Sequence, residues 1–92
     1  MKYKEEELLN RYQLIKKELA SNYEEIRITK EVLNDRKLDY LTVREYKSDI
    51  INSELVISKL KIELKEIKDF AKINNIKLVD EEDNAKVLGK RN

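Results

Sequence analysis

One stretch in the middle of the chain decides its fold: NDRKLDYLTVREY, residues 34–46, separates two helical repeats. Its Asn and Asp residues favour turns, because their side chains hydrogen-bond to the nearby backbone. The restart is marked by Thr42 and Glu45, which have the spacing of a capping box. In such a box the Thr42 hydroxyl accepts from the N–H of Glu45, and the Glu45 carboxylate accepts from the N–H of Thr42. Leu41 and Tyr46 are placed for the accompanying hydrophobic staple, so the stretch predicts a break between two helices rather than one continuous helix.

Residues on both sides of this break recur alternately every four and three positions, which is the heptad pattern of a coiled coil. The repeat before the break consists of Leu8, Tyr12, Ile15, Leu19, Asn22, Ile26, Thr29 and Leu33. The repeat after it consists of Val43, Tyr46, Ile50, Ser53, Ile57, Leu60, Leu64, Ile67 and Ala71. Facing residues of an antiparallel hairpin have a nearly constant sum of positions, and pairing Leu33 with Val43 brings the polar Asn22 opposite Ser53. A buried Asn facing Leu would cost about 1–3 kcal/mol, so this polar layer favours the register and disfavours slips of it.

The predicted fold class is all-α, an antiparallel two-helix coiled-coil hairpin over residues 1–75 with a short C-terminal appendage. The expected elements are a helix over about 3–36, a turn over about 37–42, a helix over about 43–74 and a tail over 76–92. The second helix should end near Asn74-Asn75, because Asn tolerates the left-handed conformation that ends helices. The tail is expected to be partly ordered: residues 76–79 can extend and pack back on the hairpin, and a short helix can form over 81–88.

Composition supports long helices and one domain. The chain has 92 residues, of which 42% are charged and 40% hydrophobic, with one Gly and no Pro. This balance is typical of long helices or coiled coil. Without Cys or His, neither a disulfide nor a zinc site can staple so small a core. Stability must then come from long helices or from a second chain, and we expect a homodimer, as a four-helix bundle or an end-overlapping pair.

The same composition argues against several classes of function. A net charge of +1 gives no overall field toward nucleic acid or membranes, and no apolar run approaches the roughly 20 residues that span a bilayer. The charged residues 1–7 do not resemble a signal peptide, so we expect a cytoplasmic protein. With no His, Cys or Gly-rich loop, we expect no catalytic, cofactor or metal site. The acidic run 80–83 lacks EF-hand spacing. The Lys, Asn and Ile bias suits a bacterial or phage genome.

More aliphatic residues are present than two seams require, and the surplus lies at helical spacing on the faces turned away from the seams. These residues are Ile51, Leu55, Ile62 and Ile73 on the second helix and Leu14, Ile28 and Val32 on the first. Aligned exposed aliphatics mark an interface more often than scattered ones do. We therefore predict a partner or dimer interface here. The alternatives are a chance arrangement and cover by the tail through Ile76, Leu78, Val87 and Leu88.

The predicted function is non-enzymatic protein–protein interaction, as a small adaptor, inhibitor or chaperone-like factor that uses the outer helical faces. One alternative is a nucleic-acid-associated protein, because Lys61, Lys65, Lys68 and Lys72 form a basic stripe along the second helix. In the hairpin register this stripe lies beside the acidic residues 5–7, which favours local charge pairing instead. Another alternative is a structural coiled-coil piece, such as a scaffold.

Overall fold

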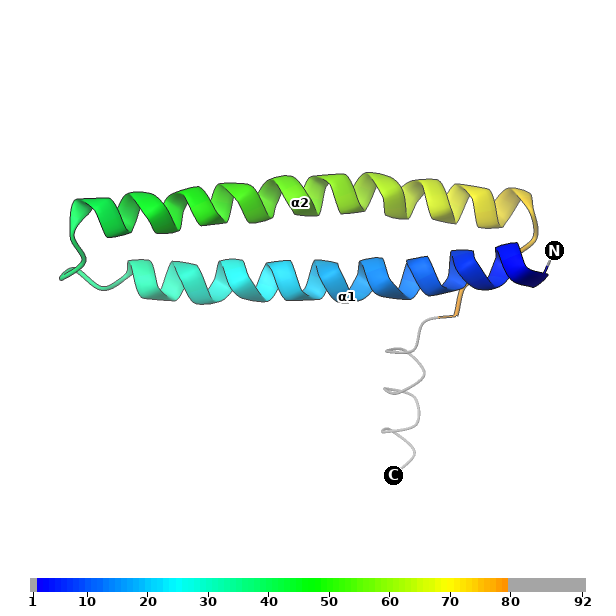
Figure 1. The fold of residues 1–92 in the computed structure, drawn as a ribbon, viewed down its shortest axis with the longest axis horizontal. Helices are drawn as coiled ribbons and strands as arrows, with labels where there is room; N and C mark the ends of the chain where they lie inside the picture. Colours follow the sequence, from blue (N-terminus) through cyan, green and yellow to red (C-terminus); the bar gives the residue numbers. More distant parts are fainter. Residues whose placement is uncertain (1, 80–92) are drawn as a thin grey trace, which may run out of the picture.

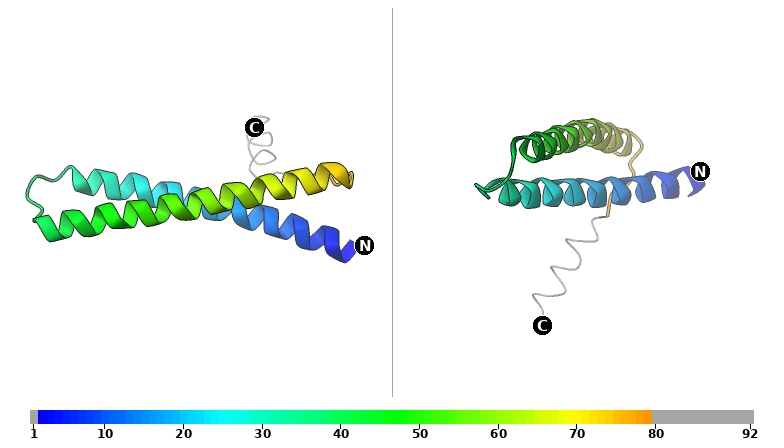
Figure 2. Two further views of the ribbon diagram at one scale, coloured as in Figure 1. Left: turned by 90° about the horizontal axis from the view of Figure 1, so that it is seen from above. Right: turned by 60° about the vertical axis from the view of Figure 1, so that its left-hand side comes forward.

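The two heptad repeats form two long α-helices that lie antiparallel to each other (Figure 1). The computed structural model describes residues 2–79, with side chains from Lys4 onward. Helix α1 spans Lys2–Leu33 and helix α2 spans Tyr40–Ile73. They run side by side and cross at a shallow angle when seen from above (Figure 2). No strand occurs within residues 2–79, so the predicted all-α hairpin is confirmed.

Helix α2 begins at Tyr40, earlier than the predicted start at position 43. Its N-cap is Asp39, whose backbone is extended (φ −77°, ψ 167°) and whose Oδ1 accepts from the N–H of Thr42 at 2.7 Å. A carboxylate suits this place because it caps the helix and also meets the positive end of the helix dipole. The N–H and hydroxyl of Thr42 hold the pKa of Asp39 below its ordinary value. The predicted capping box of Thr42 and Glu45 is therefore wrong, since Thr42 lies inside the first turn.

The predicted hydrophobic staple fails together with the predicted capping box. Leu41 is 72% exposed, so the predicted staple of Leu41 with Tyr46 is also wrong. Leu38 and Val43 are both half-buried, and they occupy the two positions that a staple takes around an N-cap at Asp39.

Helix α1 ends at Leu33 rather than near position 36. The N–H groups of Asn34 and Asp35 bond to carbonyls three residues back, at 3.1 Å each, which tightens the last turn and ends the helix. The Asp35 Oδ1 then accepts from the N–H of Lys37 at 3.0 Å, as in an Asx-turn. The side chain thus competes with the helix for backbone donors, and the loop begins there.

Helix α2 ends where the sequence predicts, near Asn74-Asn75. Asn75 is left-handed, with a φ of 55°. The N–H of Ile76 bonds to the carbonyl of Ala71 at 2.8 Å, and the N–H of Asn75 bonds to that of Lys72 at 3.4 Å. These two bonds form a Schellman motif, which satisfies carbonyls that the helix end would leave unpaired.

After the Schellman motif the chain turns back onto the hairpin. Residues 76–79 have no regular structure. Leu78 packs against the core, and the Gln13 side chain of α1 donates to the carbonyl of Val79. The predicted packing of this segment is confirmed, while the short helix predicted over 81–88 lies outside the described residues.

The seam between the helices follows the two heptads. Every position of both repeats is buried or half-buried, and Ile15 is fully buried. One core cluster contains Tyr12, Ile15, Leu60 and Ile67, with Leu8, Leu19, Leu64 and Leu78 packed against it. This cluster draws on both seams, and it lies at the end of the hairpin away from the loop.

The loop half of the hairpin is packed more loosely. No residue between positions 16 and 56 is buried. The polar seam residues explain this, because they replace aliphatic side chains that would fill the space. Asn22 bonds within its own helix, from its Nδ2 to the carbonyl of Glu18 at 2.8 Å, and Ser53 lines an open hollow. The core therefore ends where polar residues enter the two seams.

One charge pair joins the two helices beside the core. The Arg11 guanidinium donates to both carboxylate oxygens of Glu63, at 2.6 and 2.7 Å. The bidentate contact lowers the pKa of Glu63. Both side chains are about 40% exposed, at 41% and 37%, so the pair adds orientation more than stability.

Candidate functional site: the outer face of helix α2

A row of large apolar side chains lies on the side of α2 opposite the seam. The four residues predicted there, Ile51, Leu55, Ile62 and Ile73, are 59%, 57%, 63% and 80% exposed. Tyr40 at the start of the helix, 73% exposed, belongs to the same row. We call these five residues the outer face of α2.

The row is nearly straight because of its spacing. Tyr40, Ile51, Ile62 and Ile73 recur every 11 residues, which is close to three turns of an α-helix. Leu55 lies one turn after Ile51 and fills the row between two repeats. The sequence interpretation left Tyr40 out because it placed this residue in the turn, and the 11-residue interval was the signal that could have found it.

The loop end of the outer face is hollowed. A surface hollow of about 430 Å³ is lined by Tyr40, Val43, Arg44, Lys47, Ser48 and Ile51. Its walls are apolar and its rim carries the positive charges of Arg44 and Lys47. A smaller hollow of about 170 Å³ follows, lined by Ile51, Glu54, Leu55 and Ser58. The two hollows share Ile51. Side chains of another molecule can fit into them.

The predicted residues of α1 are also exposed but do not form a comparable row. Leu14, Ile28 and Val32 are 45%, 47% and 37% exposed. Leu14 is separated from the other two by almost four turns, so α1 offers isolated apolar side chains there.

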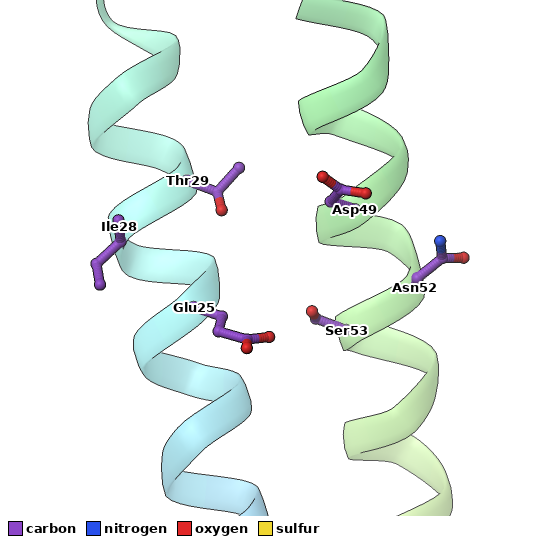
Figure 3. A pocket seen from close by; sticks show the side chains of 6 residues that line it. All are labelled: Glu25, Ile28, Thr29, Asp49, Asn52 and Ser53. Carbon is purple, nitrogen blue, oxygen red and sulfur yellow. The ribbon is translucent and has the colours of Figure 1, made fainter.

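A second hollow of about 430 Å³ lies between the helices in the loop half, lined by Glu25, Ile28, Thr29, Asp49, Asn52 and Ser53. Glu25 and Thr29 point from α1 toward α2, and Ser53 and Asp49 point back toward them (Figure 3). Ile28 and Asn52 turn away from the gap (Figure 3). The hollow is thus polar and open, where the seam lacks aliphatic side chains.

This polar hollow offers hydrogen-bonding groups but no metal-binding cluster. Within the described part of the chain, no group of three or more His, Cys, Asp or Glu residues is gathered to hold a metal ion. The carboxylates of Glu25 and Asp49 are both on exposed residues, where water competes for their charge. Such groups can contact a polar partner surface.

The four lysines of the predicted nucleic-acid stripe, Lys61, Lys65, Lys68 and Lys72, are exposed along one flank of α2. The ammonium of Lys61 lies 5.7 Å from the ring centre of Tyr23 on α1, a cation–π contact between the helices. Glu66 and Asp69 interrupt the same stretch of helix. The structure thus gives Lys61 a role within the hairpin.

The described part of the tail does not cover the outer face. Leu78 packs against the core and Val79 accepts from Gln13 of α1, whereas the outer face is on the far side of α2. Val87 and Leu88, the other tail residues considered as cover, lie outside the described residues.

Neither described helix is both long and apolar enough to cross a membrane. The chain matches no protein-family model, and no curated protein or solved structure is significantly similar to it. Any function must therefore be inferred from the chemistry of the residues themselves.

Proposed function

We propose that this chain is a non-enzymatic, cytoplasmic protein-interaction module that binds a helix of another protein chain through the outer face of α2. The observation that carries the proposal is the row of exposed apolar residues from Tyr40 to Ile73, along a helix whose opposite side is buried or half-buried. Scattered exposed aliphatics need no explanation, but an aligned row is a typical interface.

The magnitude of the apolar term fits this role. Full burial of an Ile or Leu side chain contributes about 1.5–3 kcal/mol. Ile51, Leu55 and Ile62 are already about 40% covered by their own helix. Burying what remains of the three would therefore contribute roughly 3–5 kcal/mol before the entropy of association is subtracted. Because association costs about 4–15 kcal/mol, burial of Tyr40 and Ile73 and polar contacts at the rim must add to this term.

The geometry of the face suits helix-on-helix recognition. A partner helix needs aliphatic side chains at spacings of three and four residues to follow the row. It also needs acidic groups level with Arg44 and Lys47, which rim the hollow at the loop end. The expected partner is therefore an amphipathic helix with acidic residues beside its apolar stripe.

Nucleic-acid binding is less well supported. Lys61 already contacts Tyr23, and Glu66 and Asp69 lie among the remaining lysines, where they would repel phosphates. Aromatic residues for base stacking are sparse on this flank. Binding of DNA or RNA that weakens steeply with salt would favour that alternative.

The other alternative is a structural scaffold piece. Concentration-dependent growth into large assemblies would favour it.

Site-specific photo-crosslinking tests the proposal. A benzophenone amino acid replaces Leu55 on the outer face, and a control replaces Lys17 on the exposed outer side of α1. In cells that naturally express the chain, we expect discrete protein adducts from position 55 and none from position 17. Adducts from both positions alike, or from neither, would overturn the proposal.

A further inference from the structure

We propose that the helix bound by the outer face of α2 is α2 of a second copy of this chain, in antiparallel orientation. This inference rests on the proposed function, because it names the occupant of the same face. The supporting observation is the order of apolar, basic and acidic residues along that face. When a second copy runs in the opposite direction, apolar residues meet apolar residues and basic residues meet acidic ones.

The apolar residues match themselves when the helix is reversed. Because Tyr40, Ile51, Ile62 and Ile73 are equally spaced, an antiparallel copy sets Ile51 level with Ile62 of the second copy, and Tyr40 level with Ile73 of the second copy. Both pairs occur twice by two-fold symmetry. A slip by one interval in either direction sets Leu55 level with a charged residue, so this register is the best match.

The charges match in the same register. Arg44 and Lys47 lie on the outer side of α2 near the loop end, between Tyr40 and Ile51, and Glu66 and Asp69 lie on it near the other end, between Ile62 and Ile73. In the antiparallel pair the basic two are level with the acidic two of the second copy, at both ends of the interface. A parallel pair would instead set like charges level with each other, which is destabilising.

Shape also favours this occupant. The hollow bounded by Tyr40, Val43 and Ile51 is apolar with a basic rim. In the proposed register Tyr40 is level with Ile73 of the second copy, which is 80% exposed at the opposite end of the helix. Ile73 would enter the hollow beside Tyr40, while Asp69, one turn before it, would meet the basic rim.

The assembly would brace the weaker half of each hairpin. Residues 16–56 contain no buried side chain, whereas the main core lies at the other end. Antiparallel pairing sets the well-packed end of one copy against the loose end of the other. A standard interface covers about 800 Å² per partner, roughly a tenth of the 7849 Å² surface, and the row spans all of α2. Because the outer face is opposite the seam, the four helices would form a flat layer rather than the closed four-helix bundle expected from the sequence.

Charge reversal tests the orientation. Light scattering on a sizing column should give the unaltered chain twice the 11.0 kDa of one copy. One variant carries Arg44→Glu and Lys47→Glu, and the other carries Glu66→Lys and Asp69→Lys. Each alone should elute with the mass of one chain, and an equal mixture should return to twice that mass. Glu and Lys are good helix formers, so far-UV circular dichroism should show both variants helical. Failure of the mixture to associate would overturn the antiparallel pairing.

Cysteine crosslinking tests the register. The chain has no native Cys, so Ile51→Cys and Ile62→Cys give unambiguous products. A disulfide requires Cα atoms within about 7 Å, and positions 51 of the two copies would be roughly 16 Å apart along the helix. Mixing the two variants, one of them tagged, should give the mixed disulfide, while neither alone should crosslink. Crosslinking of Ile51→Cys with itself would overturn the register.

The two proposals can fail separately. Ile62→Asp should reduce the mass to that of one chain, and an unchanged mass would overturn self-pairing through this face. A monomeric unaltered chain overturns self-pairing, while adducts of position 55 with a different protein would retain the interaction module. A monomer without any adduct would overturn both.

Discussion

Replacing Ile15 by alanine is the sharpest test of where this hairpin keeps its stability. Ile15 is the fully buried large side chain of the described core, and it packs in one cluster with Tyr12, Leu60 and Ile67. Ile28 provides a matched control, because it is the same residue type in the same helix but is 47% exposed. The pair separates loss of packing from any general effect of removing an isoleucine from α1.

The expected magnitudes differ clearly. Truncating a buried Ile to Ala costs about 2–5 kcal/mol, since the cavity adds to the lost transfer free energy. Alanine returns a few tenths of a kcal/mol through its higher helix propensity. We expect a net loss of about 3 kcal/mol for Ile15→Ala, a large share of the roughly 5–15 kcal/mol typical of small proteins. That loss corresponds to a fall in Tm on the order of 15 °C. For Ile28→Ala we expect less than about 1 kcal/mol.

Urea unfolding followed by far-UV circular dichroism measures both variants. Protein concentration is held constant, because association would add to the apparent stability. The m-values should agree with that of the unaltered chain, so that a shifted midpoint reports stability alone. Equal losses for the two variants, or a larger loss for Ile28→Ala, would refute a core centred on Ile15.

Three further predictions concern the cap, the charge pair and the tail. Asp39→Ala should destabilise the hairpin by about 1 kcal/mol and Asp39→Asn much less, because asparagine caps nearly as well; equal losses in thermal unfolding would contradict the cap. The pKa of Glu63 is lowered from its ordinary 4.5 in the folded state, so its contribution is complete above that pH and is lost as the pH falls through the lowered pKa. Glu63→Gln should weaken this acid dependence, and an unchanged pH profile would contradict the Arg11 pairing. Leu78→Ala should cost about 1–2 kcal/mol, because this half-buried side chain packs on the core; no change in the urea midpoint would show that the tail adds nothing.

Much of the hairpin follows from the period of the sequence. The alternating steps of four and three residues predict which side of each helix is buried, and every seam position is buried or half-buried. The Asn74-Asn75 end was predictable because the left-handed conformation at Asn75 is a local preference. The start of α2 was not, because Asp39 and Thr42 are both acceptable caps from sequence. The helix begins at the residue whose side-chain oxygen accepts from the first free N–H groups, and in the structure that residue is Asp39.

The candidate site shows the same division. The exposure of Ile51, Leu55 and Ile62 was predictable, because a helix with one buried side must present the residues opposite to it. The place of Tyr40 in the row was not predicted, since it depends on where α2 begins. The Arg11–Glu63 pair was missed as well, because a heptad pattern gives the facing layers but not which long side chains meet across the flank.

The sequence by itself determined that this protein is two long helices whose seams face each other. Its reason is local, since the helical period converts spacing along the chain into a side of the helix. Only the tertiary structure decided that the core gathers at the end away from the loop and that Leu78 packs against it. These outcomes depend on how side chains far apart in sequence fill one volume, and spacing along a single helix carries no measure of that volume.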